Sequence, residues 1–168
     1  IKIICEDNAD LRGINKKGLG IHIAKWGGEV EGCTITNYKT GIWANSPHAN
    51  VHNNLIKYNK EGVRIGSIAQ PGSPGISYYG QNFTIANNTI INNSNGIIVN
   101  HTIFNYNVEK GTIEGNEISY NTENGITVSN SEQWTEISNN NILRNKNGVR
   151  LINQVQWFNI MYNTINNN

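Results

Sequence analysis

Three side chains with binding chemistry occupy one position of a repeated glycine motif. His22, Trp43 and Arg64 each stand two residues after a glycine that is followed by Ile or Val. An indole offers a flat apolar face for stacking, and a guanidinium pairs with oxyanions. If the fold aligns these residues, they predict a polar and aromatic binding surface. The alternative is that Trp43 covers a loop and that His22 and Arg64 are simply solvated. We expect further rings to reach this surface from two loops: Tyr78, Tyr79 and His101.

Carboxylates, which acid–base catalysis and calcium binding require, are sparse. Asp7 and Asp10 are the only aspartates. Glu132 and Glu136 are candidates for a calcium pair, but such a pair in a loop is more often solvated. We therefore predict no catalytic residue. The weaker alternative is proton abstraction without a metal by Arg64 together with His22 or His101. The following glutamates are expected at turns or on other faces of the molecule: Glu61, Glu114, Glu117, Glu123, Glu132 and Glu136.

Histidine and cysteine spacings do not predict a metal site or a cofactor. The four histidines, at positions 22, 48, 52 and 101, lack the spacing of a ligand set. Cys5 and Cys33 are too few for a disulfide framework and form no Cys-x-x-Cys motif. We expect two buried thiols, with a single disulfide as the alternative.

Composition excludes several classes of protein. Charged residues make up 15% of the 168 residues, and the formal net charge is +1. Without a cluster of Lys and Arg, nucleic acid is not an expected partner, because phosphate binding needs a basic surface. No apolar run approaches the roughly 18 residues of a membrane span. Since the chain starts at Ile1 and ends in Asn166, Asn167 and Asn168, we expect a mature fragment or a segment of a longer solenoid.

A glycine followed by Ile or Val recurs along the chain and defines a repeat. After two insertions, at residues 66–82 and 100–111, are set aside, the period is about 22 residues. Each repeat contains three short β-prone segments and no helical periodicity. The glycines of the motif are Gly20, Gly41, Gly62, Gly96, Gly125 and Gly148.

A six-residue pattern inside each repeat predicts tight bends. Its third position holds Gly32, Asn53, Asn87, Gly115, Asn139 and Tyr162. Gly and Asn tolerate a left-handed backbone, so this position is expected to turn the chain, with Tyr162 as a weak exception. The fourth position holds Cys33, Asn54, Asn88, Asn116, Asn140 and Asn163, and a later one holds Tyr38, Asn59, Asn93, Asn121, Asn145 and Asn168. Stacked amides at these two positions would form hydrogen-bonded ladders.

The repeat predicts an all-β, right-handed parallel β-helix that forms a single domain over residues 1–168. We expect about six full rungs, a partial first rung, three parallel sheets and asparagine ladders at the turns. Trp134 and Trp157 occupy equivalent positions in successive rungs and should stack on each other. Strand alternation predicts one row on the outer face of the first sheet: His22, Trp43, Arg64, Ile98, Thr127 and Arg150.

The Gly-Ile-x-[Ile/Val] motifs, the Asn-Asn-x-Ile bends and the run Cys33-Thr34-Ile35-Thr36-Asn37-Tyr38 resemble the pectate-lyase-like superfamily. Within it, the chain resembles the carbohydrate-binding and sugar-hydrolase β-helix repeats, which include a periplasmic copper-processing accessory protein. The resemblance implies a polysaccharide lying along the outside of the first sheet. It also implies that lyases and hydrolases of this type place several carboxylates there, which this sequence lacks.

We therefore expect an extracellular, cell-surface or periplasmic module that binds polysaccharide without cleaving it. The predicted binding residues are His22, Trp43, Arg64, Tyr78, Tyr79 and His101. One alternative is a polysaccharide lyase, epimerase or hydrolase, or a fragment of one. Another is a structural solenoid whose rungs stack end to end into fibres.

Overall fold

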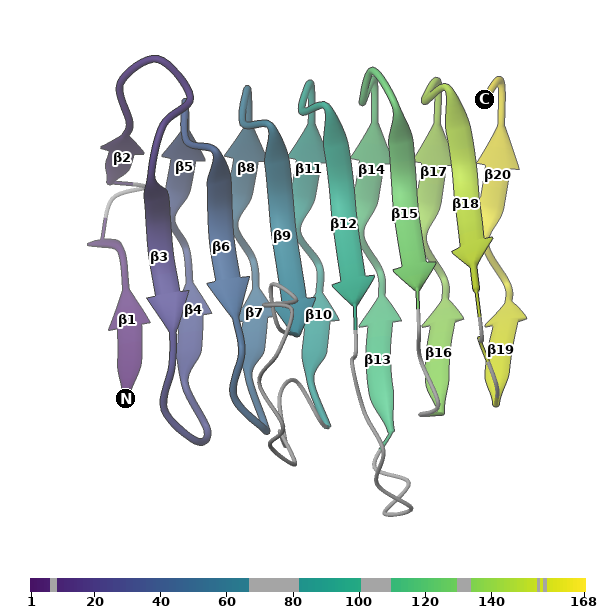
Figure 1. The fold of residues 1–168 in the computed structure, drawn as a ribbon, viewed down its shortest axis with the longest axis horizontal. Helices are drawn as coiled ribbons and strands as arrows, with labels where there is room; N and C mark the ends of the chain where they lie inside the picture. The colour runs from purple at the N-terminus through teal and green to yellow at the C-terminus, as the bar shows by residue number, and fades with distance from the viewer. Residues whose placement is uncertain (7–8, 67–81, 101–109, 130–133, 154, 156) are drawn as a thin grey trace.

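The computed structural model describes residues 1–6, 9–66, 82–100, 110–129, 134–153, 155 and 157–168. Within these residues the chain forms twenty β-strands and no α-helix. It follows that none of the described segments is a helix able to cross a membrane. The strands wind into a solenoid whose two termini lie at opposite ends of its long axis (Figure 1).

Every strand pairs in parallel with the equivalent strand of the next rung, which gives three sheets. Sheet A contains β1 (Lys2–Ile4), β4 (Glu29–Glu31), β7 (Asn50–His52), β10 (Thr84–Ala86), β13 (Gly111–Glu114), β16 (Thr135–Ser138) and β19 (Phe158–Met161). Sheet B contains β2 (Asp10–Arg12), β5 (Thr34–Thr36), β8 (Leu55–Lys57), β11 (Thr89–Ile91), β14 (Glu117–Ser119), β17 (Asn141–Leu143) and β20 (Thr164–Asn166). Sheet C contains β3 (Leu19–Ile23), β6 (Thr40–Ala44), β9 (Glu61–Gly66), β12 (Asn95–Asn100), β15 (Asn124–Ser129) and β18 (Asn147–Ile152). The predicted parallel β-helix is confirmed.

The core consists of columns of β-branched side chains stacked from rung to rung. In sheet B, for example, Ile56, Ile90 and Ile118 pair in register and are fully buried. Each buried isoleucine contributes about 1.5 to 3 kcal/mol relative to an exposed one. The short strands form because these residues suit a pleated surface, and the buried columns then fix their register.

The bends between sheets A and B have the predicted left-handed backbone. All six residues at the third position of the pattern have positive φ, from Asn87 at 54° to Gly32 at 71°. Tyr162 adopts the same geometry, with φ of 57°, so the last rung keeps its bend despite its side chain.

A second set of left-handed residues, between sheets B and C, was not predicted. Tyr58, Tyr120 and Arg144 have φ of 61°, 56° and 53°, although none is Gly or Asn. A left-handed residue with a full side chain costs roughly 1 to 2 kcal/mol, so the stacked rungs hold these residues in place. The guanidinium of Arg144 lies over the Tyr120 ring, 5.2 Å from its centroid.

Both asparagine ladders are present. In the first, Asn88 Nδ2 donates to Asn116 Oδ1 at 3.0 Å, and Asn116 Nδ2 donates to Asn140 Oδ1 at 2.9 Å. Each oxygen also accepts the backbone N–H of the asparagine on the previous rung, as Asn116 Oδ1 does from Asn88 at 2.9 Å. The second ladder repeats this arrangement from Asn59 to Asn168. Buried amides are thus satisfied along the whole stack.

Glycine is required after the second bend because the backbones of successive rungs approach closely. A Cβ built on Gly62 would lie 2.5 Å from the carbonyl oxygen of Gly96. The next glycines of the column are equally confined, since a Cβ on Gly96 would lie 2.5 Å from the oxygen of Gly125. The motif therefore requires glycine because a Cβ atom would not fit between successive rungs, and not because the backbone has positive φ.

The cysteines form a disulfide, so the prediction of two buried thiols is wrong. Ile3 pairs with Val30, which puts Cys5 level with Gly32 and next to Cys33. The Cα atoms of Cys5 and Cys33 are 4.9 Å apart. The expected contact of Trp134 with Trp157 is confirmed, with ring centroids 6.4 Å apart and planes inclined by 18°.

Candidate functional site

The outer face of sheet C carries the row of side chains that the repeat predicts. His22 pairs with Trp43, Trp43 with Arg64, and Arg64 with Ile98. Thr127 and Arg150 continue the register on β15 and β18. The row therefore runs along the solenoid axis, with one side chain for each rung and a spacing of about 4.8 Å.

His22 and Trp43 form a stacked pair at one end of this row. Their ring centroids are 4.4 Å apart and their planes are inclined by 7°. The indole Nε1–H donates to the Gly66 carbonyl oxygen at 2.8 Å, which fixes the ring. One face of Trp43 is thus covered by imidazole, so a ligand would meet an ordered ring pair rather than a bare indole.

Arg64 is paired with a carboxylate of its own strand, which corrects one prediction. Glu61 is the first residue of β9 rather than a turn residue, and it accepts hydrogen bonds from Arg64 Nε at 2.8 Å and Nη2 at 2.6 Å. The hydroxyl of Thr40 donates to the same carboxylate at 2.8 Å. Burial would raise the pKa of Glu61, but the hydrogen bonds from Arg64 and Thr40 outweigh burial and lower it. Glu61 is therefore ionised.

A second polar row, which the sequence analysis missed, lies beside the first. Asn124 Nδ2 donates to Asn95 Oδ1 at 2.7 Å, and Asn147 Nδ2 donates to Asn124 Oδ1 at 2.9 Å. Thr40 and Glu61 occupy the equivalent positions of β6 and β9. The signal was available, because these residues all immediately precede the glycine of the repeat.

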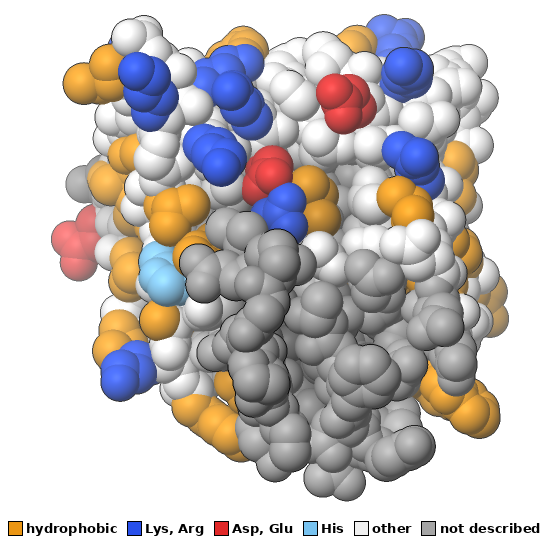
Figure 2. Space-filling view, in the orientation of Figure 1, with side chains coloured by type: hydrophobic (Ala, Val, Ile, Leu, Met, Phe, Trp, Pro, Cys, Tyr) orange, Lys and Arg blue, Asp and Glu red, His pale blue; other side chains and the backbone are white. Residues whose placement is uncertain are grey.

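The remaining predicted binding residues, Tyr78, Tyr79 and His101, lie outside the described residues, as does Glu132. Figure 2 shows sheet C from outside, and on the part drawn in colour the basic side chains are scattered among uncharged ones rather than gathered in one patch. This distribution agrees with the near-zero net charge.

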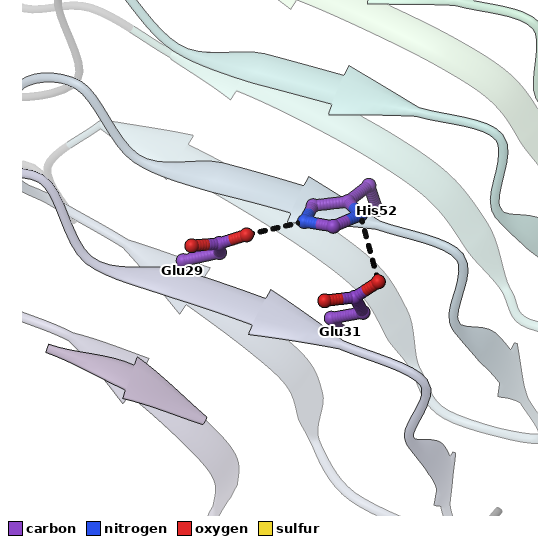
Figure 3. Close-up of side chains that lie close together, drawn as sticks. All are labelled: Glu29, Glu31 and His52. Carbon is purple, nitrogen blue, oxygen red and sulfur yellow. Dashed lines mark hydrogen bonds and ion pairs between the residues drawn. The ribbon is translucent and has the colours of Figure 1, made fainter. Parts of the chain in front are cut away.

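A cluster on the outer face of sheet A was also missed by the sequence analysis (Figure 3). His52 Nε2 lies 2.7 Å from Glu29 Oε1, and His52 Nδ1 lies 3.8 Å from Glu31 Oε1. Lys2 Nζ contacts both carboxylates, at 3.1 Å from Glu29 and 3.0 Å from Glu31. The hydrogen bond from His52 and then that from Lys2 lower the pKa of Glu29, and chiefly Lys2 lowers that of Glu31, so both carboxylates are ionised. Glu31 and His52 share the second position of the six-residue pattern, which is the signal that could have paired them.

Three stacked parallel sheets with asparagine ladders define the molecule as a parallel β-helix. Residues 67–168 match the family model described as a right handed beta helix region, and the chain belongs to that family. Among solved structures it is similar to the crystal structure of pectate lyase Pel9A, with a TM-score of 0.52 and 19% sequence identity. The match covers 73% of this chain and 32% of that lyase, so the chain spans about a third of the length of the lyase. A comparison with curated proteins finds no significant match.

Proposed function

We propose that this β-helix binds polysaccharide along the outer face of sheet C without cleaving it. The observation that carries the proposal is the pair of parallel rows on that face. One row begins with His22, Trp43 and Arg64, and the other contains the hydrogen-bonded amides of Asn95, Asn124 and Asn147. An aromatic pair at one end of the face and amides on three successive rungs at the other suit a linear polymer of hydroxyl-rich units lying parallel to the solenoid axis.

The carboxylate content of sheet C supports binding rather than cleavage. Glu61 is the only acidic residue in the six strands of this sheet. Glycoside hydrolysis generally uses two carboxylates on either side of the bond that is cleaved. Glu61 is an unsuitable proton donor because Arg64 and Thr40 stabilise its ionised form. The same ion pair makes Arg64 a poor base, because loss of its proton would leave a partly buried carboxylate without its partner.

The Cys5–Cys33 disulfide supports a location outside a reducing cytoplasm. Disulfides persist mainly in the periplasm, at the cell surface and in secreted proteins. Polysaccharides are accessible in those compartments, so the proposed location and the proposed ligand agree.

Electrophoresis through gels that contain a soluble neutral glucan or an acidic polyuronide tests the proposal. We expect one polymer class to retard the wild-type chain, and Trp43→Ala to weaken that retention at least tenfold, as expected for an aromatic at the centre of a contact. Trp157→Ala is the matched control, because this exposed indole lies in the connection between β18 and β19 and belongs to neither row of sheet C. Thermal unfolding of each variant separates loss of binding from loss of fold. Equal retention of Trp43→Ala and wild type would overturn the site, and shortened polymer chains would overturn the noncatalytic role.

A further inference from the structure

We propose that Glu29, Glu31 and His52 form a binding site for a divalent transition metal ion such as Zn²⁺. The three side chains lie on the outer face of sheet A, away from the proposed polysaccharide surface. Their candidate ligand atoms all lie within 4.8 Å of one another. The site is independent of the proposed function, because it uses different residues and a different sheet.

Strand pairing brings these donors together. Glu29 and Glu31 stand two residues apart on β4, so both point to the same face of the sheet. Glu31 pairs with His52 on the neighbouring strand β7. Val30 and Val51, which also pair with each other, are fully buried and anchor the two strands in the core. The backbone positions of the three donors are therefore fixed by packing.

The distances are compatible with one bound ion. Zn²⁺ lies about 2.0 to 2.2 Å from nitrogen and oxygen ligands, so two ligands of one ion are at most about 4.4 Å apart. His52 Nε2 lies 2.7 Å from Glu29 Oε1, and one ligand atom from each of the three residues can be chosen so that all lie within 4.8 Å of one another. Small rotations of two partly exposed glutamates would complete the geometry. Asn53 Nδ2 lies 3.1 Å from His52 Nδ1, so binding of the ion at Nε2 requires the imidazole proton to move to Nδ1 and the Asn53 amide to turn its oxygen toward that nitrogen.

The types of ligand atom in this cluster indicate which metal ion it would bind. One imidazole with two carboxylates suits Zn²⁺ and similar transition ions. Calcium takes six to eight oxygen ligands, and magnesium is generally held by oxygen and water. A nitrogen donor and two glutamates therefore favour Zn²⁺ over both.

Lys2 provides a second observation that this position attracts cations. Its ammonium group contacts one oxygen of each glutamate, at 3.1 and 3.0 Å. The Lys2 side chain is 44% exposed, so it can move into water when a metal ion replaces its charge. Because a bound metal ion would have to displace the Lys2 ammonium group, removal of this lysine should strengthen metal binding.

Calorimetric titration of the metal-free chain with ZnCl₂ tests the site. We expect one ion per chain, at least tenfold weaker binding for His52→Ala, and about fivefold tighter binding for Lys2→Gln. Glu114→Gln is the matched control, because Glu114 continues the same column of sheet A through Ala86 but has no histidine beside it. This variant should bind as the wild type does.

Titration with Co²⁺ gives a second readout that does not depend on affinity alone. Visible absorption of a nitrogen-ligated Co²⁺ should appear in the wild type, Lys2→Gln and Glu114→Gln, and disappear in His52→Ala. Circular dichroism checks that each variant is folded. Equal zinc affinity of the wild type and His52→Ala, or weaker binding by Lys2→Gln, would show that these residues form only a network of ion pairs.

Discussion

The imidazole of His22 lies flat against the indole of Trp43, with centroids 4.4 Å apart and planes inclined by 7°. The two residues come from neighbouring strands, β3 and β6, and meet because these strands pair in register. Because the hydrogen bond to Gly66 already orders the indole, a ligand that contacts this pair need not immobilise it. The proposed polysaccharide surface consists of this ordered ring pair and the polar row beside it.

Reduction of the disulfide should destabilise the first rung. The bridge closes a segment of 28 residues, for which chain-entropy estimates give about 3 to 4 kcal/mol of stabilisation. Ile1, Ile3 and Ile4 are exposed, so packing alone holds β1 weakly. Limited proteolysis with and without reductant should show faster cleavage near the N-terminus after reduction. A Cys5→Ser/Cys33→Ser variant should be cleaved fast in both conditions; equal resistance of reduced and oxidised wild type would contradict this prediction.

Removal of one buried ladder amide should lower the free energy of unfolding far more than removal of the exposed amide next to it in the sequence. Asn140 donates to Asn163, Ile113 and Ser138, and accepts two hydrogen bonds from Asn116. Asn140→Ala leaves several buried groups without partners and should cost about 3 kcal/mol or more. Asn141→Ala removes an exposed amide and should cost less than about 0.5 kcal/mol. Denaturant unfolding of both variants measures the difference, and similar midpoints would refute the role of the ladder.

Tyr162 offers a stabilising substitution. This side chain is 82% exposed and its backbone has φ of 57°, a conformation that asparagine tolerates better. Tyr162→Asn should therefore raise the free energy of unfolding by about 1 kcal/mol. Tyr162→Val should have the opposite effect, because a β-branched residue is more strained at positive φ. Thermal unfolding of the pair gives the sign, and the reverse order would contradict the strain argument.

Protonation of the Glu61 carboxylate should lower the stability of the fold in acid. Its pKa in the folded chain is below the ordinary 4.5, so its stabilising contribution is present above that value and is lost as the pH falls through the folded pKa. Glu61→Gln should cost about 1 to 3 kcal/mol near neutral pH and have a flatter stability profile in acid. Denaturant unfolding from about pH 7 to about pH 3 compares the two proteins. Parallel profiles would mean that Glu61 contributes nothing to the acid dependence.

The features that repeat in the sequence were predictable, and the contacts that depend on a single register were not. The bends and ladders follow from residue types, since Gly or Asn recurs at fixed positions. The left-handed residues Tyr58, Tyr120 and Arg144 were missed because their types do not indicate positive φ, and stacking overrides the local preference. The Cys5–Cys33 bridge depends on how the first, partial rung aligns with the next, through the pairing of β1 with β4 and of β2 with β5.

The alignment of the site residues in one row could be predicted from the sequence, but the contacts of their side chains could not. Alternation and period gave the alignment of His22, Trp43 and Arg64. The pairing of Arg64 with Glu61 was missed because β9 begins one residue before the glycine of its repeat, which brings Glu61 into the sheet. The repeat could have paired Glu31 with His52, but Glu29 lies outside the six-residue pattern, and the three side chains meet only across the pairing of β4 with β7.

Fluorescence titration of a chain whose only indole is Trp43 tests the proposed polysaccharide surface most directly. Trp26, Trp134 and Trp157 are all exposed, so their replacement by phenylalanine should preserve the fold. We predict a saturable change in Trp43 emission with one class of polysaccharide, neutral or acidic, and no change when His22 and Arg64 are also replaced by alanine. An emission spectrum that no polysaccharide alters, in a chain that remains folded, would contradict the claim that sheet C is the binding face.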